Sequence, residues 1–351
     1  MTILLVSDSD DSAFACNLLA EQLRRRGQTC LTVGQPLSSK RESPLPLIEP
    51  QIHFPVDQLH GSQLLEQASA IGLFLCKPER LASFVHSHRE LAHHQGRRPI
   101  PIFSGPLSPS LGDRLMGQLH EALCCDLLVL PGQRQLDAVE TVIRRWPESA
   151  WHPKLLGMGL WFLPERPARG SLNAGSAKPP HHLLALVQED APTVLGGKSQ
   201  LLRQLIQWAE RSTDWSVVVQ RDQNWERHQP WIPKFQAAEW RLPENLTFAA
   251  PGQLLSHLAG CSACLSVSSP WALAAMAWGR QTLIVGDYGI HTNEGTTSWF
   301  GCGAMHRLQS IEHLDQLLEL PPHNASWLDA MGWEIHDGAD RLIQALKQWN
   351  R

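Results

Sequence analysis

The chain of 351 residues is long enough for two domains of ordinary size. Hydrophobic residues make up 43% of it and charged residues 18%, a balance that excludes intrinsic disorder. The net charge is −4 and no basic patch with interleaved aromatics appears, so we expect no nucleic-acid partner. No apolar run approaches the roughly 20 residues that span a bilayer, although peripheral membrane association stays open. The N-terminus lacks a signal-peptide pattern, so we expect a cytoplasmic protein.

The N-terminal residues predict a strand, a helix and a second strand. Ile3–Val6 is an apolar strand, Ala13–Arg26 carries apolar residues on one helical face before Gly27, and Cys30–Val33 is the next strand. An acidic turn at 7–12, with the sequence SDSDDS, stands where a dinucleotide-binding domain would carry Gly-x-Gly-x-x-Gly. The turn therefore argues against an NAD-type site.

Strands and helices continue to alternate, which predicts a parallel, doubly wound α/β sheet in each half of the chain. Pro164–Pro180, rich in Pro, Gly, Ser and Ala, is a linker by composition. Before it we expect strands at Ile71–Leu75, Pro101–Ser104 and Asp126–Leu130 and a helix at Ala138–Arg145. After it we expect strands at Leu183–Val187, Trp215–Val219 and Leu246–Phe248, a helix at Lys198–Arg211 and a helical tail over 326–351.

One strand–turn–helix unit in the second half carries the strongest functional signal. The strand Ala263–Val267 runs into Ser268 and Ser269, and Pro270 at the first helical position follows a serine N-cap. The helix Trp271–Trp278 is short and rich in alanine. A small-residue turn at a helix N-terminus exposes backbone N–H groups, and two hydroxyls add donors, which predicts a phosphate site. A βαβ unit can also carry such a turn without any ligand.

A second polar loop is expected at the same edge of the sheet. The strand Thr282–Val285 ends in Gly-Asp-Tyr-Gly at 286–289. Open α/β sheets bind ligands at the carboxyl ends of their strands. We therefore add Asp287, Gly289 and Glu294 to the two serines as candidate ligand contacts.

The cysteines and histidines do not predict a metal site. Cys261 and Cys264 form a single C-x-x-C pair before an apolar strand, so we expect small buried thiols. The 17 histidines form neither H-x-x-x-H nor H-E-x-x-H. Asp8-Ser9-Asp10 is formally D-x-D, but it belongs to the first half, away from the predicted phosphate turn.

Six stretches, by their order and spacing, resemble a group of bacterial glycosyltransferases often associated with surface-polysaccharide genes. They are SDSD near the N-terminus, DLLVLPG at 126–132, LLGMGLWFLP at 155–164, SVSSPWALAAMAWG at 266–279, LIVGDYGI at 283–290 and ASWLDAMGW at 325–333. The resemblance covers most of the chain. It implies a GT-B-like architecture, in which two Rossmann-like domains face each other across a cleft and a C-terminal helix returns to the first domain.

The resemblance also implies roles for single residues. In GT-B enzymes that use CMP-activated acidic sugars, a paired-serine motif binds the nucleotide phosphate, and Ser268 and Ser269 match that pair. A histidine, often next to a proline, assists the leaving group, but here one residue separates His228 from Pro230. A basic residue often ends the preceding strand, and only Arg221 keeps the charge there.

In the same class an acidic residue of the first domain acts as the base. The turn at 7–12 offers Asp8, Asp10 and Asp11 at the carboxyl end of the first strand. We expect Asp10 to be the base, because Asp8 lies closest to the strand and is expected to cap the turn. The alternative is that the turn is structural, as an Asx turn or an N-cap for the following helix.

The predicted organisation is an acceptor-side domain over 1–165, a linker over 166–181, a nucleotide-sugar domain over 182–335 and a helix over 336–351. The predicted reaction is metal-independent, inverting transfer from a nucleotide sugar to a surface glycan or lipid-linked acceptor, with a CMP-sugar favoured over a UDP- or GDP-sugar. No other cofactor is expected. The departures at Gln220 and His228 leave open a catalytically weakened relative that binds a nucleotide sugar or a partner glycosyltransferase. A sugar-nucleotide epimerase on the same fold is a third, weaker alternative.

Overall fold

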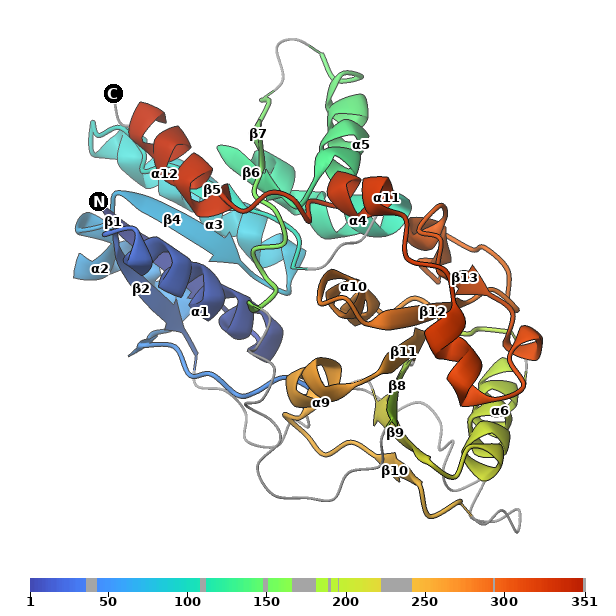
Figure 1. The fold of residues 1–351 in the computed structure, drawn as a ribbon. Helices are drawn as coiled ribbons and strands as arrows, with labels where there is room; N and C mark the ends of the chain where they lie inside the picture. The colour runs from blue at the N-terminus through green and yellow to red at the C-terminus, as the bar shows by residue number, and fades with distance from the viewer. Residues whose placement is uncertain are drawn as a thin grey trace. The chain divides into compact units, whose positions relative to one another are not determined.

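The computed structural model describes residues 1–35, 43–107, 112–147, 151–165, 181–188, 191–194, 196–221, 242–292 and 294–349. The chain forms two compact α/β units (Figure 1). Unit 1 comprises Met1–Ser39, Leu47–Pro164 and Asp329–Arg351, and unit 2 comprises Lys40–Pro46 and Glu165–Leu328. The second domain was expected to extend to residue 335, whereas unit 2 ends at Leu328.

Unit 1 is built on a sheet of seven strands in the order β3-β2-β1-β4-β5-β6-β7, with every neighbouring pair parallel. The strands are β1 (Thr2–Ser7), β2 (Thr29–Gly34), β3 (Ile52–His53), β4 (Ala70–Phe74), β5 (Ile102–Ser104), β6 (Leu127–Leu130) and β7 (Lys154–Gly157). The helices are α1 (Asp10–Arg25), η1 (Val56–Gly61), α2 (Gln63–Glu66), α3 (Pro78–His94), α4 (Gly112–Leu119), η2 (Glu121–Cys124), α5 (Gln133–Ile143) and α12 (Gly338–Trp349).

Both faces of this sheet are covered, as the apolar run in β1 requires. Ile3 and Leu5 pack on one side with residues of α1 and α12, and Leu4 and Val6 pack on the other with residues of α3, α4 and α5. All four side chains are fully buried. Figure 1 shows α1 and α12 together on one face of the sheet. The predicted return of the C-terminal helix to the first domain is confirmed.

Two glycines let the returning tail lie with its backbone against the backbone of unit 1. Gly332 has a φ of +95°, and a Cβ there would lie 2.3 Å from the carbonyl oxygen of Pro131. A Cβ on Gly338 would lie 1.9 Å from the carbonyl oxygen of Met158. Any side chain at either position would force the two segments apart, so glycine is required by the close approach.

Unit 2 holds a sheet of six strands in the order β10-β9-β8-β11-β12-β13, again parallel throughout. The strands are β8 (His181–Val187), β9 (Trp215–Arg221), β10 (Leu246–Phe248), β11 (Ala263–Ser266), β12 (Gln281–Val285) and β13 (Met305–His306). Among the described residues, unit 2 has the helices α6 (Gly197–Arg211), α9 (Leu254–Gly260), α10 (Trp271–Ala277), η3 (Thr296–Trp299), η4 (Leu308–Ser310) and η5 (Leu314–Glu319), and α11 (Ala325–Ala330) crosses the boundary to unit 1.

Each sheet has a point where the chain changes its direction of travel across the strands. In unit 1 this switch point lies between β1 and β4, because β2 and β3 were added on the other side of β1. In unit 2 it lies between β8 and β11. The crevice beyond the carboxyl ends of the strands at such a point is where open α/β sheets bind ligands. The topology therefore selects one place in each unit.

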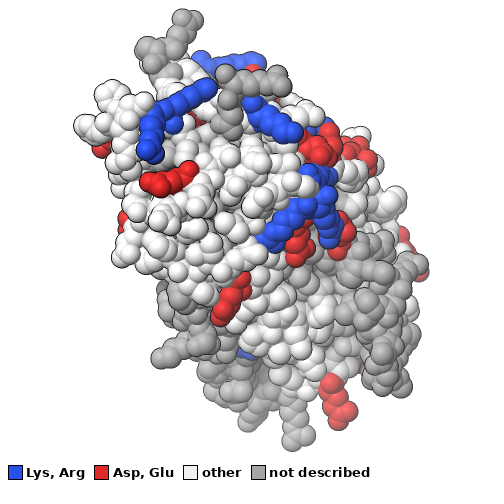
Figure 2. Space-filling view, turned by 90° about the vertical axis from the view of Figure 1, so that its left-hand side faces the viewer, with Lys and Arg blue, Asp and Glu red and all other residues white. Residues whose placement is uncertain are grey.

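Two properties of the molecule beyond its sheets bear on its partners. None of the helices in the described ranges is both long and apolar enough to cross a membrane. On the face drawn in Figure 2, the Lys and Arg side chains of the described residues lie interspersed with Asp and Glu side chains. That face offers no broad single-sign patch of the kind that binds nucleic acid.

Candidate functional site

The switch point of unit 2 is bridged by one side chain. Gln188 directly follows β8, and Ser268 lies in the turn between β11 and α10. The Oε1 atom of Gln188 accepts hydrogen bonds from Ser268 N at 3.0 Å and from Ser268 Oγ at 3.1 Å. Both residues are buried. The predicted serine turn therefore lies at the switch point, and Gln188, directly after β8, holds it there by hydrogen bonds.

Ser268 fixes the turn through its hydroxyl. Besides bonding Gln188, Ser268 Oγ donates to the carbonyl oxygen of Glu294. A hydroxyl has one proton, so these two buried acceptors share it. A donor role for Ser268 toward a phosphate, as the sequence predicted, would require one of these bonds to break. Ser268 therefore holds the turn together, and a phosphate contact from it stays a prediction.

Ser269 is the better-placed donor of the pair. Its backbone N–H donates to Ser266 Oγ at 2.8 Å, and its Oγ accepts from Trp271 N at 3.4 Å. No acceptor for its hydroxyl proton is present among the residues that the structure describes. The helix begins at Trp271 with Pro270 as its N-cap, one position later than the predicted serine cap with proline at the first helical position.

Glu294 brings a buried carboxylate to the same turn. Its Oε1 accepts from Thr193 N at 2.7 Å and from Thr193 Oγ1, and the residue is only 1% exposed. Its Oε2 is buried and has no hydrogen-bond partner within the described part of the chain. Leaving a buried carboxylate oxygen without a donor is unfavourable, and a ligand contact from Glu294 stays a prediction.

The loop after β12 is fixed by hydrogen bonds to neighbouring segments of unit 2. Asp287 Oδ2 accepts from the backbone N–H of Leu308 at 2.7 Å, so this carboxylate holds the segment that follows β13. Tyr288 donates to the carbonyl oxygen of Gly197 at 3.1 Å, and burial raises the pKa of its hydroxyl well above the usual range. Gly289 turns the chain with a φ of +82°. Asp287 and Gly289 therefore have structural functions here, and a ligand contact from either stays a prediction.

The carboxyl end of β9 carries the predicted cation. Arg221 is the last residue of β9, paired in register with Val187 of β8, and its guanidinium lies 5.2 Å from the centre of the Phe248 ring. Gln220 beside it is buried, and its Oε1 has no hydrogen-bond partner among the described residues. His228, the predicted leaving-group residue, falls in 222–241, outside the described residues.

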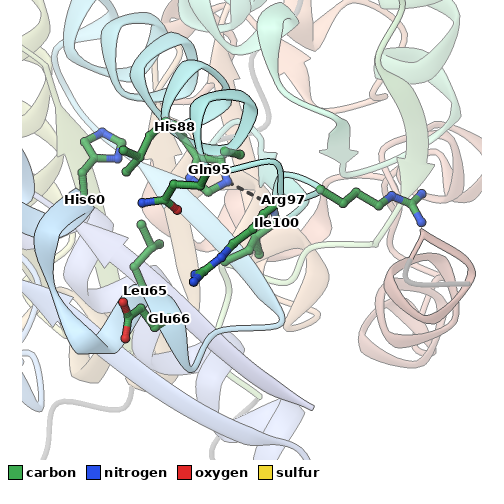
Figure 3. Close-up of a pocket in the computed structure, with 10 residues that line it drawn as sticks. His60, Leu65, Glu66, His88, Gln95, Arg97 and Ile100 are labelled. Atoms are coloured by element: carbon green, nitrogen blue, oxygen red, sulfur yellow. Dashed lines mark hydrogen bonds between the residues drawn. The ribbon is translucent and has the colours of Figure 1, made fainter.

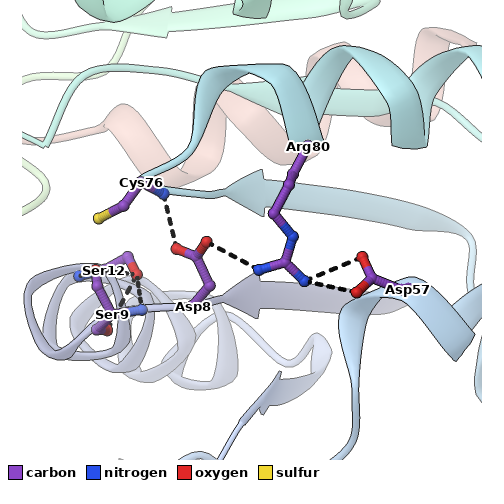
Figure 4. A network of polar contacts seen from close by, with 6 residues as sticks. All are labelled: Asp8, Ser9, Ser12, Asp57, Cys76 and Arg80. Carbon is purple, nitrogen blue, oxygen red and sulfur yellow. Dashed lines mark hydrogen bonds and ion pairs between the residues drawn. The ribbon is translucent and has the colours of Figure 1, made fainter.

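Unit 1 shows a matching bridge at its own switch point (Figure 4). Asp8 follows β1, and its Oδ1 accepts from the backbone N–H of Cys76, which follows β4, at 2.7 Å. Its Oδ2 lies 3.5 Å from Arg80 Nη1, and Arg80 also pairs with Asp57 at 3.0 Å. The side chain of Asp8 is only 4% exposed. Asp8 thus ties the ends of β1 and β4 together.

The helix cap in this turn is Ser9, so the expectation that Asp8 caps the turn is wrong. Ser9 Oγ accepts from Ser12 N at 3.2 Å, and Ser12 Oγ accepts from Ser9 N at 3.1 Å, which makes a reciprocal capping box. The helix α1 consequently begins at Asp10, three residues before the predicted start at Ala13. A serine satisfies the exposed N–H groups as well as an aspartate does, which leaves Asp8 for Cys76.

The capping box places the other two aspartates in the first turn of α1. Asp10 is buried, at 5% exposure, whereas Asp11 is exposed. Carboxylates in a first helical turn are stabilised by the helix dipole. Asp10 remains the candidate base, and its catalytic role stays a prediction. Among the described residues, no three His, Cys, Asp or Glu side chains gather in a way that could hold a metal ion.

The fold is similar to that of several solved structures over almost the whole chain. The UDP-GlcNAc 2-epimerase from Methanocaldococcus jannaschii has a TM-score of 0.65 at 10% identity, covering 99% of this chain and 100% of that one. The enzyme from Neisseria meningitidis, bound to UDP-GlcNAc, has 0.62 at 12%, with 99% and 100% covered. The enzyme from Rickettsia bellii has 0.63 at 9%, with 99% and 97% covered. The predicted GT-B-like fold is thereby confirmed.

The sequence was also compared with curated proteins and with models of protein families. No curated protein matches the chain. A family model described as "Putative glycosyltransferase (DUF6716)" matches residues 54–349. Because that match spans well over half of the 351 residues, the chain belongs to this family.

Proposed function

We propose that the protein is a glycosyltransferase that takes its sugar from a nucleotide-sugar donor bound at the switch point of unit 2. The observation that carries the proposal is the bond from Ser268 to Gln188 across β8 and β11. Beside the same turn, Glu294 Oε2 has no hydrogen-bond partner among the described residues. The family description supports a transfer reaction. The Neisseria structure, bound to UDP-GlcNAc, supports a nucleotide sugar as the ligand of this fold.

Each residue at the serine turn has a separate proposed role in binding the nucleotide sugar. Ser269 donates its hydroxyl proton to the nucleotide phosphate, while Gln188 and Ser268 hold the turn rigid. Glu294 Oε2 accepts a hydrogen bond from a hydroxyl of the nucleotide sugar, because this buried carboxylate oxygen finds no donor in the described part of the chain. Arg221 supplies positive charge from the end of β9. Fixed donors and charges that face a departing phosphate stabilise the negative charge that develops on it, without requiring a metal.

Asp10 is proposed as the base of an inverting transfer. An acceptor hydroxyl loses its proton as it attacks the sugar, and a positioned carboxylate can take that proton. Asp10 is buried in the turn that follows β1, at the switch point of unit 1. The proposed acceptor is a surface glycan or a lipid-linked precursor, and the proposed compartment is the cytoplasm.

The donor is proposed to carry a pyrimidine nucleotide. The serine pair matches the motif of enzymes that use CMP-sugars, which favours cytidine. The solved structure bound to UDP-GlcNAc favours uridine. A thermal-shift screen against CMP, UDP, GDP and ADP separates these cases, because a ligand that binds only the folded protein raises its melting temperature. A shift with GDP or ADP alone would contradict the proposal.

A sugar-nucleotide epimerase is the second candidate, because the solved structures described above are UDP-GlcNAc 2-epimerases that match 99% of this chain. Incubation with UDP-, CMP- and GDP-sugars, followed by proton NMR of the sugar and assay of released nucleotide, distinguishes the two. A transferase releases nucleotide only when an acceptor is present. An epimerase produces a new sugar stereoisomer without an acceptor. Binding without any turnover would contradict both and leave the catalytically weakened relative.

A further inference from the structure

Unit 1 holds a pocket at the amino edge of its sheet, the edge opposite Asp8 (Figure 3). The second half of α3, the helices η1 and α2, and the segment that leads into β5 form its walls. The pocket is open to solvent on one side, and about 470 Å³ of space lies between its lining residues and at its mouth. Its apolar wall comprises Leu65, Leu91, Ala92 and Ile100. Nothing in the proposed transfer reaction uses it.

His88 gives the pocket wall a buried donor without an acceptor. The backbone N–H of Ile100 donates to His88 Nε2 at 3.1 Å, which fixes that nitrogen as an acceptor. The neutral ring must then carry its proton on Nδ1. His88 is only 5% exposed, and its Nδ1 is buried with no hydrogen-bond partner among the described residues. A buried donor in this state is unfavourable and calls for an acceptor.

His60 adds a second ring to the same wall. It stacks on Phe84, with 4.2 Å between the ring centres, and lies 6.3 Å from the ring of His88. Its Nδ1 is likewise buried without a partner in the described part of the chain. Burial lowers the pKa of both histidines, so both rings are neutral near pH 7 and act as hydrogen-bonding groups rather than charges.

A helix C-cap brings positive charge to the mouth. At the end of α3, Arg97 N donates to the carbonyl oxygen of Ala92 and Gly96 N donates to that of His93, with Gly96 at a φ of +62°. This Schellman cap turns the chain back so that Arg97 and Arg98 both line the pocket while remaining exposed. Glu66 is the one carboxylate among the lining residues, so the lining carries a net positive charge.

We propose that this pocket binds a small organic carboxylate with an apolar body. The carboxylate accepts from His88 Nδ1–H and pairs with the guanidinium of Arg97, because guanidiniums form strong charge-assisted hydrogen bonds to carboxylates. The apolar body packs against the aliphatic wall. A fully hydrated anion such as inorganic phosphate gains nothing from that wall, which is why we assign a carboxylate with an apolar group rather than a simple anion.

Benzoate and benzamide are matched probes for this site, because they share a shape and differ in charge. Histidine side chains labelled with ¹⁵N in the full chain report binding by NMR. We expect saturable shifts of the His88 and His60 ring nitrogens with benzoate, and binding at least about 10-fold weaker with benzamide and with inorganic phosphate. His88→Gln, whose amide oxygen can still accept from Ile100 N, should weaken benzoate binding at the His60 signal.

The charge contribution is tested with two pairs of arginines. Arg97→Gln with Arg98→Gln should weaken benzoate binding by about 10-fold or more, whereas Arg144→Gln with Arg145→Gln, an exposed pair directly after α5, should not. Both double variants remove the same charge. Equal loss in the two, equal binding of benzamide or phosphate, or the absence of shifts at both histidine rings would each overturn the proposal. The experiment uses no nucleotide, so its outcome is independent of the proposed transferase activity.

Discussion

Gln188 and Ser268 join the two strands between which the order of the unit 2 sheet reverses. One acceptor atom, Gln188 Oε1, takes both the backbone N–H and the hydroxyl of Ser268, at 3.0 and 3.1 Å. Asp8 and Cys76 make the corresponding link in unit 1 at 2.7 Å. In each unit, the side chain of the residue directly after the first strand is therefore hydrogen-bonded to a residue that follows the neighbouring strand at the switch point.

Gln188→Ala should lower both stability and nucleotide affinity. The backbone N–H of Ser268 is buried and would lose its acceptor, which costs about 1–3 kcal/mol. The turn that presents Ser269 would also lose its support. Urea unfolding measures the first effect and titration calorimetry with UDP or CMP measures the second.

Gln200→Ala is the control for this change. It is the same glutamine-to-alanine substitution, but Gln200 is exposed on α6 and does not belong to the serine turn. It should change the unfolding free energy by less than about 0.5 kcal/mol and leave nucleotide affinity intact. If the two variants behave alike, the bond between Gln188 and Ser268 does not organise the site.

The two serines should separate in mutation. Ser269→Ala removes the proposed phosphate donor and should weaken nucleotide binding by roughly 10- to 100-fold, since a hydrogen bond to a charged group contributes about 1.5–3 kcal/mol. Ser268→Ala removes a hydroxyl that bonds Gln188 and Glu294, so it should mainly lower the free energy of unfolding. Calorimetry and urea unfolding of both variants test this division, and the reverse pattern would exchange the roles of the serines.

Sequence patterns located the strands well because buried parallel strands are continuous apolar runs. Ile3–Val6 was expected and Thr2–Ser7 is observed, and the helix expected at Trp271–Trp278 is found at Trp271–Ala277. Helix starts were harder. The start of α1 was predicted wrongly. With three aspartates in the turn, Asp8 was expected to be the cap, whereas Ser9 accepts the capping hydrogen bond from Ser12 N.

The site could be predicted only as far as local sequence reaches. The serine turn is recognisable from its own sequence. Its partner Gln188, however, lies 80 residues from Ser268 along the chain. The partner of Glu294, Thr193, lies 101 residues from it. Pairings of this kind depend on which strands become neighbours, and the strand order is not written in local periodicity. The one available signal was a polar residue directly after an apolar strand, and it fits Gln188.

Asp8→Ala should lower the unfolding free energy by about 1–3 kcal/mol, because the backbone N–H of Cys76 would lose its acceptor and Arg80 a buried partner. Asp57→Ala is the matched control, since it removes the other partner of Arg80 from a side chain that is 74% exposed. Such an exposed pair contributes less than about 1 kcal/mol. Urea unfolding of both variants measures the difference, and equal effects would show that Asp8 is not a structural link.

Stability should fall as the pH drops below about 6.5, and His88 should account for part of the fall. Burial lowers the pKa of His88 in the folded state, so the unfolded chain takes up protons first and is favoured at lower pH. His88→Gln, whose amide oxygen can still accept from Ile100 N, should flatten the pH dependence between pH 7 and 5. His86→Gln on the exposed side of α3 should not. Urea unfolding across this pH range compares them, and equal slopes would mean that His88 does not titrate as its burial implies.

Asp10→Asn should abolish most of the transfer activity and spare nucleotide binding. A positioned carboxylate base contributes roughly 10²- to 10⁴-fold to such a reaction, and an amide of the same shape cannot take the proton. Asp10 belongs to unit 1, whereas the nucleotide is proposed to bind at the serine turn of unit 2, so the affinity for UDP or CMP should not change. Glu21→Gln, an exposed carboxylate-to-amide change on the same helix, should retain full activity. Acceptor-dependent nucleotide release is the measurement. Full activity of Asp10→Asn would leave Asp10 with its structural role in the first turn of α1 and would require a different base.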